Sequence, residues 1–119
     1  MTNFAQYPSL SGKTVVITGG ASGIGAEMVR AFAAQGAKVG FLDRDTETSA
    51  ALAADLPGVT YELCDLRDIA ALRTALAALQ SRNGAATVLV NNAARDDRHD
   101  WREVTPDYWD ERQATNLRH

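Results

Sequence analysis

Three glycines form the first pattern in this sequence that could do chemistry. They are spaced Gly19-x-x-x-Gly23-x-Gly25 and follow a short apolar run at 15–17. A glycine-rich turn between a strand and a helix brings several backbone N–H groups and the positive end of the helix dipole to one point, which favours a phosphate. We therefore expect residues 18–25 to bind a phosphate-containing ligand.

The residues that follow the glycines indicate which phosphate is expected. The P-loop of nucleoside-triphosphate-binding proteins ends in Gly-Lys-Ser/Thr, whereas Gly25 is followed by Ala26 and Glu27. No lysine is in position to reach a terminal phosphate, so we expect a pyrophosphate. A glycine-rich loop alone also occurs as a purely structural turn, and the rest of the chain must decide between the two interpretations.

A carboxylate that could recognise a ribose follows at Asp43. It lies eighteen residues beyond Gly25, close to the offset of about 20 at which a carboxylate meets the adenosine ribose of a dinucleotide. Such a carboxylate accepts hydrogen bonds from the 2′-hydroxyl and repels a 2′-phosphate, which favours NAD over NADP as the cofactor. The positive charge of Arg44 partly offsets this preference. The alternative interpretation is that Asp43 caps the helix that follows.

Alternating strands and helices must position these residues. Short apolar runs predict strands at 13–18, 38–42, 59–63 and 87–90. Helical periodicity and capping residues predict helices at 23–35, 46–56, 69–83 and from 106 onward. Because each crossover is helical, the predicted fold class is α/β, a Rossmann-type doubly wound parallel sheet of which the chain supplies the N-terminal β-α-β-α-β-α-β-α portion.

The carboxyl ends of these parallel strands should lie at one edge of the sheet, where ligands bind in this architecture. The loops expected there are 18–25, 43–45, 64–68 and 91–99. The polar residues of the sequence fall on these loops. This agreement favours a ligand-binding domain over a purely structural module.

The apolar patterns also predict which faces are buried. Helical spacing predicts two buried stripes, Ile24, Met28, Phe32 and Gln35 on the first helix and Ile69, Leu72, Leu76 and Leu79 on the third. The strand at 87–90 is expected to be buried on both faces. Trp109 is expected to pack in the core, and Asn116, on the same helical face, to be a buried polar residue that needs partners.

Composition excludes several classes of function. The 119 residues, 45% of them hydrophobic, fit an N-terminal arm at 1–12 and a dinucleotide-binding domain at 13–119 that is incomplete at its C-terminus. The net charge of −3 without a basic stripe argues against nucleic acid as a partner. No apolar run is long enough to span a membrane, no secretory signal and no metal-ligand spacing is visible, and Cys64 is the only cysteine, so we expect a cytoplasmic protein without a metal.

Four motifs occur in an order that resembles the short-chain dehydrogenase/reductase family. They are Thr18-Gly19-x-x-x-Gly23-Ile24-Gly25, Cys64-Asp65-Leu66, Asn91-Asn92-Ala93-Ala94 and Thr115-Asn116-Leu117. The resemblance covers essentially the whole chain and implies an oxidoreductase that transfers a hydride between its substrate and NAD. One departure is Ala94, where the family usually has glycine, and it matters if the backbone there needs a positive φ.

The resemblance also implies roles for individual residues. Asp65 and Leu66 would contact the adenine, Asn92 would lie along the adenosine ribose, and Asn91 would tie the central strands together. Asn116, the catalytic residue implied here, would help to hold a proton-relay water behind the family's lysine. The complete set of expected cofactor-binding residues is Gly19, Ala21, Ser22, Gly23, Ile24, Gly25, Asp43, Asp65, Leu66, Asn92 and Ala93.

A narrower resemblance concerns the segments 95–99, 108–112 and 116–119. They are similar to segments of NAD-dependent sugar dehydrogenases of the D-xylose 1-dehydrogenase type, which oxidise C1 of an aldose to a lactone. The resemblance implies an aldose or related secondary alcohol as the substrate, with Arg95 and His99 as its contacts, and a homo-oligomer, either a tetramer or a dimer. Two alternatives remain, a solvated charged loop at 95–103 and a short-chain reductase of a 3-oxoacyl or other carbonyl substrate.

The catalytic tyrosine and lysine of the family, spaced Tyr-x-x-x-Lys, do not occur in these 119 residues. The tyrosines and the residues four positions later are Tyr7 and Ser11, Tyr61 and Asp65, and Tyr108 and Arg112. The lysine would lower the pKa of the tyrosine and allow it to act as a base. We therefore expect the chain to be the cofactor-binding part of a longer enzyme. The alternative is a truncated, non-catalytic nucleotide-binding fragment.

Overall fold

The first strand of the sequence lies inside a parallel sheet. In the computed structural model, which describes residues 4–119, the strands are β1 (Thr14–Thr18), β2 (Lys38–Asp43), β3 (Thr60–Leu63) and β4 (Val88–Val90). Their order in the sheet is β3-β2-β1-β4, and all neighbouring strands are parallel, with Val16 of β1 opposite both Gly40 and Leu89. The predicted α/β class and doubly wound parallel sheet are confirmed.

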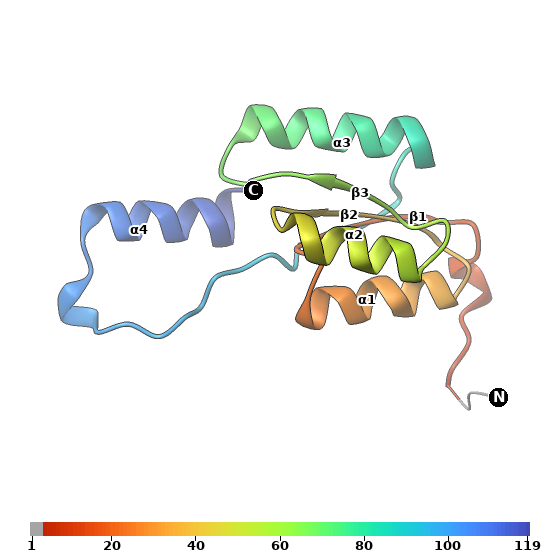
Figure 1. The fold of residues 1–119 in the computed structure, drawn as a ribbon, viewed down its shortest axis with the longest axis horizontal. Helices are drawn as coiled ribbons and strands as arrows, with labels where there is room; N and C mark the ends of the chain where they lie inside the picture. Colours follow the sequence, from red (N-terminus) through yellow and green to blue (C-terminus); the bar gives the residue numbers. More distant parts are fainter. Residues whose placement is uncertain (1–3) are drawn as a thin grey trace.

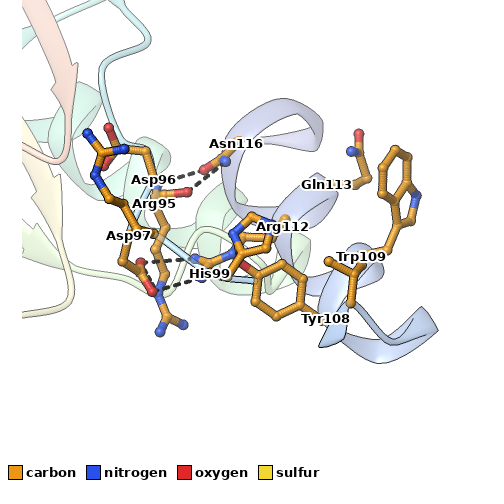
Figure 2. A pocket seen from close by; sticks show the side chains of 11 residues that line it. Arg95, Asp96, Asp97, His99, Tyr108, Trp109, Arg112, Gln113 and Asn116 are labelled. Atoms are coloured by element: carbon orange, nitrogen blue, oxygen red, sulfur yellow. Dashed lines mark hydrogen bonds and ion pairs between the residues drawn. The ribbon is translucent and has the colours of Figure 1, made fainter. Parts of the chain in front are cut away.

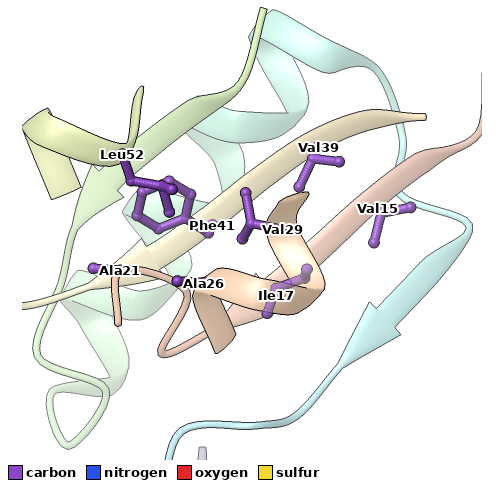
Figure 3. Close-up of a cluster of buried hydrophobic side chains, with 8 residues drawn as sticks. All are labelled: Val15, Ile17, Ala21, Ala26, Val29, Val39, Phe41 and Leu52. Atoms are coloured by element: carbon purple, nitrogen blue, oxygen red, sulfur yellow. The ribbon is translucent and has the colours of Figure 1, made fainter. Parts of the chain in front are cut away.

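Helices cover both faces of the sheet (Figure 1). The helices α1 (Gly23–Ala34) and α2 (Thr46–Asp55) lie on one face, and α3 (Ile69–Asn83) lies on the other. Side chains alternate along β1, so Val15 and Ile17 pack toward α1 and α2 while Val16 packs toward α3. Figure 3 shows the first of these two clusters, with Phe41 and Leu52 at one end.

Three helices begin at the capping residues that their sequences favour. Asp45 accepts a hydrogen bond from the Thr48 N–H, Asp68 from the Ala71 N–H and Thr105 from the Tyr108 N–H. The cap of α2 is therefore Asp45, and the alternative that Asp43 caps this helix is wrong. That result leaves the Asp43 carboxylate available for another role.

The two predicted apolar stripes are confirmed in part. Ile24 is 76% exposed, and α1 instead buries Gly25, Ala26 and Val29 against the sheet. On α3 the fully packed residues are Ala75 and Leu79, whereas Leu76 is exposed. Met28, Phe32 and Leu72 of the predicted stripes do pack against the core, as Leu79 does, so only the outer members Ile24 and Leu76 turn away from the sheet.

The fourth strand is an edge strand among the described residues. It pairs with β1 on one side only, and Leu89 is 60% exposed. The expectation that 87–90 is buried on both faces is therefore wrong for this chain, because no described element covers the outer face at Leu89.

The N-terminal arm is tied to the end of α1. For its residues 4–12, the Gln35 side chain accepts a hydrogen bond from the Tyr7 N–H at 2.7 Å and donates one to the Ala5 carbonyl at 3.1 Å. A short 3-10 turn, η1 (Pro8–Leu10), follows. The first three residues of the arm lie outside the described residues.

The last helix extends away from the sheet (Figure 1). A long loop and the 3-10 turn η2 (Trp101–Glu103) lead into α4 (Pro106–Gln113), which continues as one π-helical turn, η3 (Ala114–Arg118). Trp109 is 59% exposed and Asn116 is also exposed, so both burial predictions for this helix are wrong. The reason is that α4 does not pack on the sheet. Within residues 4–119 no helix is long and apolar enough to cross a membrane.

Candidate functional site

A groove of about 540 Å³ lies at the carboxyl ends of all four strands. It is the rim at which the sequence analysis places a ligand. All of the expected cofactor-binding residues except Ala21 and Asp65 line it. The other lining residues are Leu42, Arg44, Cys64, Ala94, Arg95, Asp96 and Thr115. The structure therefore brings together residues that are spread over more than half of the chain.

The N-terminus of α1 opens into this groove without a capping side chain. Ser22 occupies the N-cap position, yet within the described residues its side chain makes no capping hydrogen bond. The helices α2, α3 and α4 are all capped by side chains. The first-turn N–H groups of α1 thus remain available to an anionic ligand, for which the helix dipole adds a favourable charge.

The glycines of the loop allow both the sharp turn and close backbone packing. A Cβ at Gly25 would lie 1.9 Å from the Gly19 carbonyl oxygen, and one at Gly19 (φ +67°) would lie 2.9 Å from Cα of Ala93. Gly23 has φ +53°, and a Cβ there would meet no described atom within 4 Å. The loop is therefore packed tightly against the segment that follows β4 on one side and open to the groove on the other, which suits a pyrophosphate.

Asp43 joins the end of β2 to the glycine-rich loop. Its Oδ2 accepts a hydrogen bond from the Ala21 N–H at 3.0 Å, and its Oδ1 accepts one from the Asp45 N–H at 3.0 Å. Ala21 is buried, which explains why it lies behind the groove and not on its wall. The carboxylate is half-buried, and these two bonds fix it at the wall of the groove.

Thr18 and Asn92 lock β4 to the same loop. The Thr18 hydroxyl accepts hydrogen bonds from the N–H groups of Asn92 and Ala93, at 3.1 and 3.0 Å, and the Asn92 amide donates to the carbonyls of Thr18 and Gly19, both at 3.1 Å. The expected tie between central strands is thus made by Asn92, whereas Asn91 is exposed. Ala94 fits without strain, because no non-glycine residue in 4–119 has a positive φ.

The loop at the end of β3 presents Leu66, not Asp65, to the groove. Arg67 binds the Asp65 carboxylate through Nε at 3.0 Å and Nη2 at 2.6 Å. These hydrogen bonds lower the pKa of Asp65 to about 2. Leu66 and Cys64 are buried, and burial raises the pKa of the Cys64 thiol. Sequence reasoning did not find Arg67, although an arginine two residues after an aspartate is a signal for such a pair.

A second cavity of about 640 Å³ lies between residues 95–99 and α4 (Figure 2). It contains both expected substrate residues, Arg95 and His99, and it adjoins the groove because Arg95 and Asp96 line both. Asp97, Tyr108 and Arg112 belong to the segments that resemble sugar dehydrogenases, but sequence reasoning assigned them no individual roles. Nδ1 of His99 lies 2.8 Å from the Tyr108 hydroxyl, the Arg112 guanidinium lies 4.6 Å from the centre of the Tyr108 ring, and Arg112 pairs with Asp97 at 2.9 Å.

Asn116 anchors the wall between the two cavities. Its Oδ1 accepts a hydrogen bond from the Arg95 N–H at 2.7 Å, and its Nδ2 donates one to the Arg95 carbonyl at 3.0 Å. The π-helical turn η3 carries Asn116, and such turns are frequent at functional sites.

Neither cavity suggests a metal centre, since no group of three or more His, Cys, Asp or Glu side chains in the described part of the chain could hold an ion.

Three features mark this rim: a glycine-rich loop before the uncapped N-terminus of α1, a carboxylate after β2 and an Asn-Asn-Ala segment after β4. A comparison with known protein families agrees with them. The short chain dehydrogenase family model matches residues 13–118. The chain belongs to the short-chain dehydrogenase family. This result confirms the resemblance inferred from the four sequence motifs.

Curated relatives in this family include several sugar dehydrogenases. The chain is 52% identical over 119 residues to a D-xylose 1-dehydrogenase of Caulobacter vibrioides, with 97% of this chain and 46% of the relative covered. It is 45% identical over 120 residues to a probable galactose dehydrogenase of Rhizobium meliloti, with 97% and 47% covered. The chain thus spans about half the length of these relatives.

Solved structures of family members share the fold. A Serratia marcescens short-chain dehydrogenase/reductase mutant superposes with a TM-score of 0.85 at 32% identity, covering 93% of this chain and 47% of that one. A 3-ketoacyl-(acyl-carrier-protein) reductase from Brucella melitensis, solved with NADH, gives 0.83 at 30% identity, covering 91% and 46%.

Proposed function

We propose that the chain is the cofactor-binding part of an NAD-dependent sugar dehydrogenase that oxidises C1 of an aldose. The observation that carries this proposal is the groove in which the uncapped N-terminus of α1 and the Asp43 carboxylate lie together. The N–H groups of Gly23 and Ile24 hold the pyrophosphate, and Asp43 accepts hydrogen bonds from the adenosine ribose. Its charge disfavours the 2′-phosphate of NADP.

The remaining expected residues complete the nucleotide site. Leu66 packs against the adenine, while Asp65, held by Arg67, shapes the loop around it. Asn92 and Ala93 form the floor beneath the adenosine ribose side of the site, where Thr18 fixes their backbone. When bound, NAD accepts the hydride that leaves the substrate.

The substrate class rests on the second cavity and on the relatives. Arg95 and His99 lie next to the groove, in a cavity whose side chains both donate and accept hydrogen bonds, as a polyhydroxylated ligand requires. The relatives at 52% and 45% identity are named for D-xylose and galactose, both aldoses. Asn116 holds the Arg95 backbone at the wall of this cavity, where we place its contribution to the proton relay.

An assay for NADH formation tests this function. The protein expressed from its gene is incubated with NAD and each member of an aldose panel that includes D-xylose and D-galactose. We expect NADH to form with at least one aldose, and we expect no oxidation of NADH or NADPH when a 3-oxoacyl thioester is supplied instead. No NADH with any aldose would reject the sugar assignment, and oxidation of NADPH by a 3-oxoacyl thioester would favour the reductase alternative, which the Brucella melitensis reductase supports at 30% identity.

A further inference from the structure

Glu111 on α4 lies between the loop that follows β3 and the loop that follows β4. Its Oε1 is 3.7 Å from Nη1 of Arg67, in the loop between β3 and α3, and 3.4 Å from Nη1 of Arg95, in the loop after β4. The Glu111 side chain is 23% exposed, less than either arginine. One shielded carboxylate therefore contacts cations from two loops that are distant in the sequence.

The helix itself orients this carboxylate. Glu111 and Thr115 are four residues apart and so share one face, and the Thr115 hydroxyl donates a hydrogen bond to Glu111 Oε1 at 3.0 Å. A carboxylate that is already oriented loses less side-chain entropy when it pairs with a guanidinium. The hydroxyl contact thus strengthens a link that would be weak between two mobile side chains.

Arg67 continues the link toward the nucleotide groove. While its Nη1 faces Glu111, its Nε and Nη2 bind Asp65, and its backbone carbonyl accepts a hydrogen bond from Arg118 Nη2 at 2.8 Å. The loop 64–68 is therefore attached to the α4–η3 segment by both the side chain and the backbone of one residue.

Arg95 continues the link toward the second cavity. Its Nη1 faces Glu111, its Nε binds Asp97 at 3.0 Å, and its backbone is held by Asn116. A connected set of ionic contacts thus runs from Asp65 through Arg67, Glu111 and Arg95 to Asp97. It joins the wall of the groove to the wall of the second cavity.

We propose that Glu111 is a positioning residue that holds loop 64–68 and residues 95–97 in one mutual arrangement, so that nucleotide binding and the shape of the adjoining cavity are set together. The nucleotide and substrate roles of these two segments rest on the proposed function, whereas the physical link does not. Exposed ion pairs are individually weak. Here two arginines share one carboxylate that is partly shielded from water and oriented by a hydroxyl, and this arrangement allows the ion pairs to hold the two segments together.

Backbone amide exchange tests the link without any ligand. The Arg67 N–H is bonded to Asp65 Oδ1 and the Arg95 N–H to Asn116 Oδ1, so each reports on one segment. In Glu111→Gln we expect both amides to exchange about 3–10-fold faster than in the wild type, with the difference shrinking in high salt. Asp110→Asn is the matched control, because the Asp110 carboxylate has no ion pair or hydrogen bond within residues 4–119, and it should leave both rates unchanged.

Thr115→Val provides a second variant with all charges retained. It removes the hydroxyl that orients Glu111 and should accelerate the same two amides by a smaller factor. The proposal is wrong if either amide keeps its wild-type rate in Glu111→Gln, or if Asp110→Asn accelerates both equally. Circular dichroism identifies a variant that has unfolded, in which case Thr115→Val decides alone.

A nucleotide titration separates the link from the proposed function. We expect the Kd for NAD to rise about 3–10-fold in Glu111→Gln and to stay unchanged in Asp110→Asn. A wild-type protein that does not bind NAD would contradict the proposed function, and the amide rates would still decide whether Glu111 links the two segments. An unchanged Kd in a Glu111→Gln protein with accelerated amides would overturn the claim that the link sets nucleotide binding.

Discussion

The carboxylate of Asp43 and the backbone N–H of Ala21 are joined by a 3.0 Å hydrogen bond. This contact makes the end of β2 and the glycine-rich loop a single structural unit. The residue that would select between cofactors is therefore held by the loop that would bind their shared pyrophosphate. Any change at Asp43 tests both selectivity and loop geometry, and the choice of variant must separate the two.

Asp43→Asn should weaken the preference for NAD over NADP. The amide oxygen can still accept the Ala21 hydrogen bond. The amide nitrogen cannot replace Oδ1 as the acceptor of the Asp45 N–H, and the charge that repels a 2′-phosphate is lost. We expect the ratio of the Kd values for NADP and NAD to fall about tenfold. Calorimetric titration with both cofactors measures it. Asp45→Asn, which changes the α2 cap, is the control and should keep the wild-type ratio; the same ratio in Asp43→Asn would reject the ribose role.

Gly25→Ala should destabilise the fold strongly. The added Cβ would lie 1.9 Å from the Gly19 carbonyl oxygen, so the loop or α1 must move. We expect a loss of about 3 kcal/mol or more in the free energy of unfolding, measured in urea. Gly58→Ala is the comparison, because its positive φ costs about 1–2 kcal/mol but no described atom lies within 4 Å of the new Cβ. Equal losses in the two variants would show that the close approach at Gly25 is not tight.

Thr18→Val should loosen β4 from the rest of the sheet. Thr18 is 3% exposed, and its hydroxyl accepts two backbone hydrogen bonds that valine cannot accept. Leaving both N–H groups without this acceptor costs about 1–3 kcal/mol. Thr18→Ser retains the hydroxyl and should lose less than half as much in the same denaturation experiment. A valine variant as stable as the wild type would contradict the role given to this hydroxyl.

The Asp65–Arg67 pair predicts a pH-dependent stability. Arg67 lowers the pKa of the Asp65 carboxyl from 3.8 to about 2. Because the folded-state pKa is depressed, the ionised carboxylate stabilises the protein above the unfolded pKa, and this contribution is lost as the pH falls from about 4 toward 2. Asp65→Asn should therefore be less stable by about 1 kcal/mol at pH 6, a value reduced for the exposure of the pair, and the difference should vanish near pH 2.

Denaturation curves from pH 2 to pH 6 measure this difference. Asp110→Asn again serves as the control, since it removes a carboxylate that makes no ion pair or hydrogen bond within residues 4–119, and its stability should follow that of the wild type. A constant difference between Asp65→Asn and the wild type across this pH range would show that the pair does not stabilise the fold.

The order of elements was predictable because each carries local signals. Apolar runs, helical periodicity and capping residues depend on neighbouring residues only, and the structure reproduces the predicted boundaries within one or two positions. Which residues line the groove was also predictable, since a parallel sheet brings the carboxyl ends of its strands to one edge.

Burial and side-chain pairing were less predictable because they depend on what packs against each element. Trp109 was expected in the core but is exposed, since α4 lies beside the sheet and not on it. Leu89 is exposed for a related reason, as β4 is an edge strand among the described residues. The contact of Glu111 with Arg67 joins residues 44 positions apart, and no local pattern indicates it.

The most direct test of the central claim follows the backbone amides of α1 by NMR while NAD is added to the protein. If the pyrophosphate binds at the uncapped helix N-terminus, the amide signals of Gly23, Ile24 and Gly25 should shift most, together with that of Asp43, while those of Gly58 and Gly84 stay in place. Binding of NAD that leaves the Gly23–Gly25 signals unchanged, or no binding at all, would contradict the account.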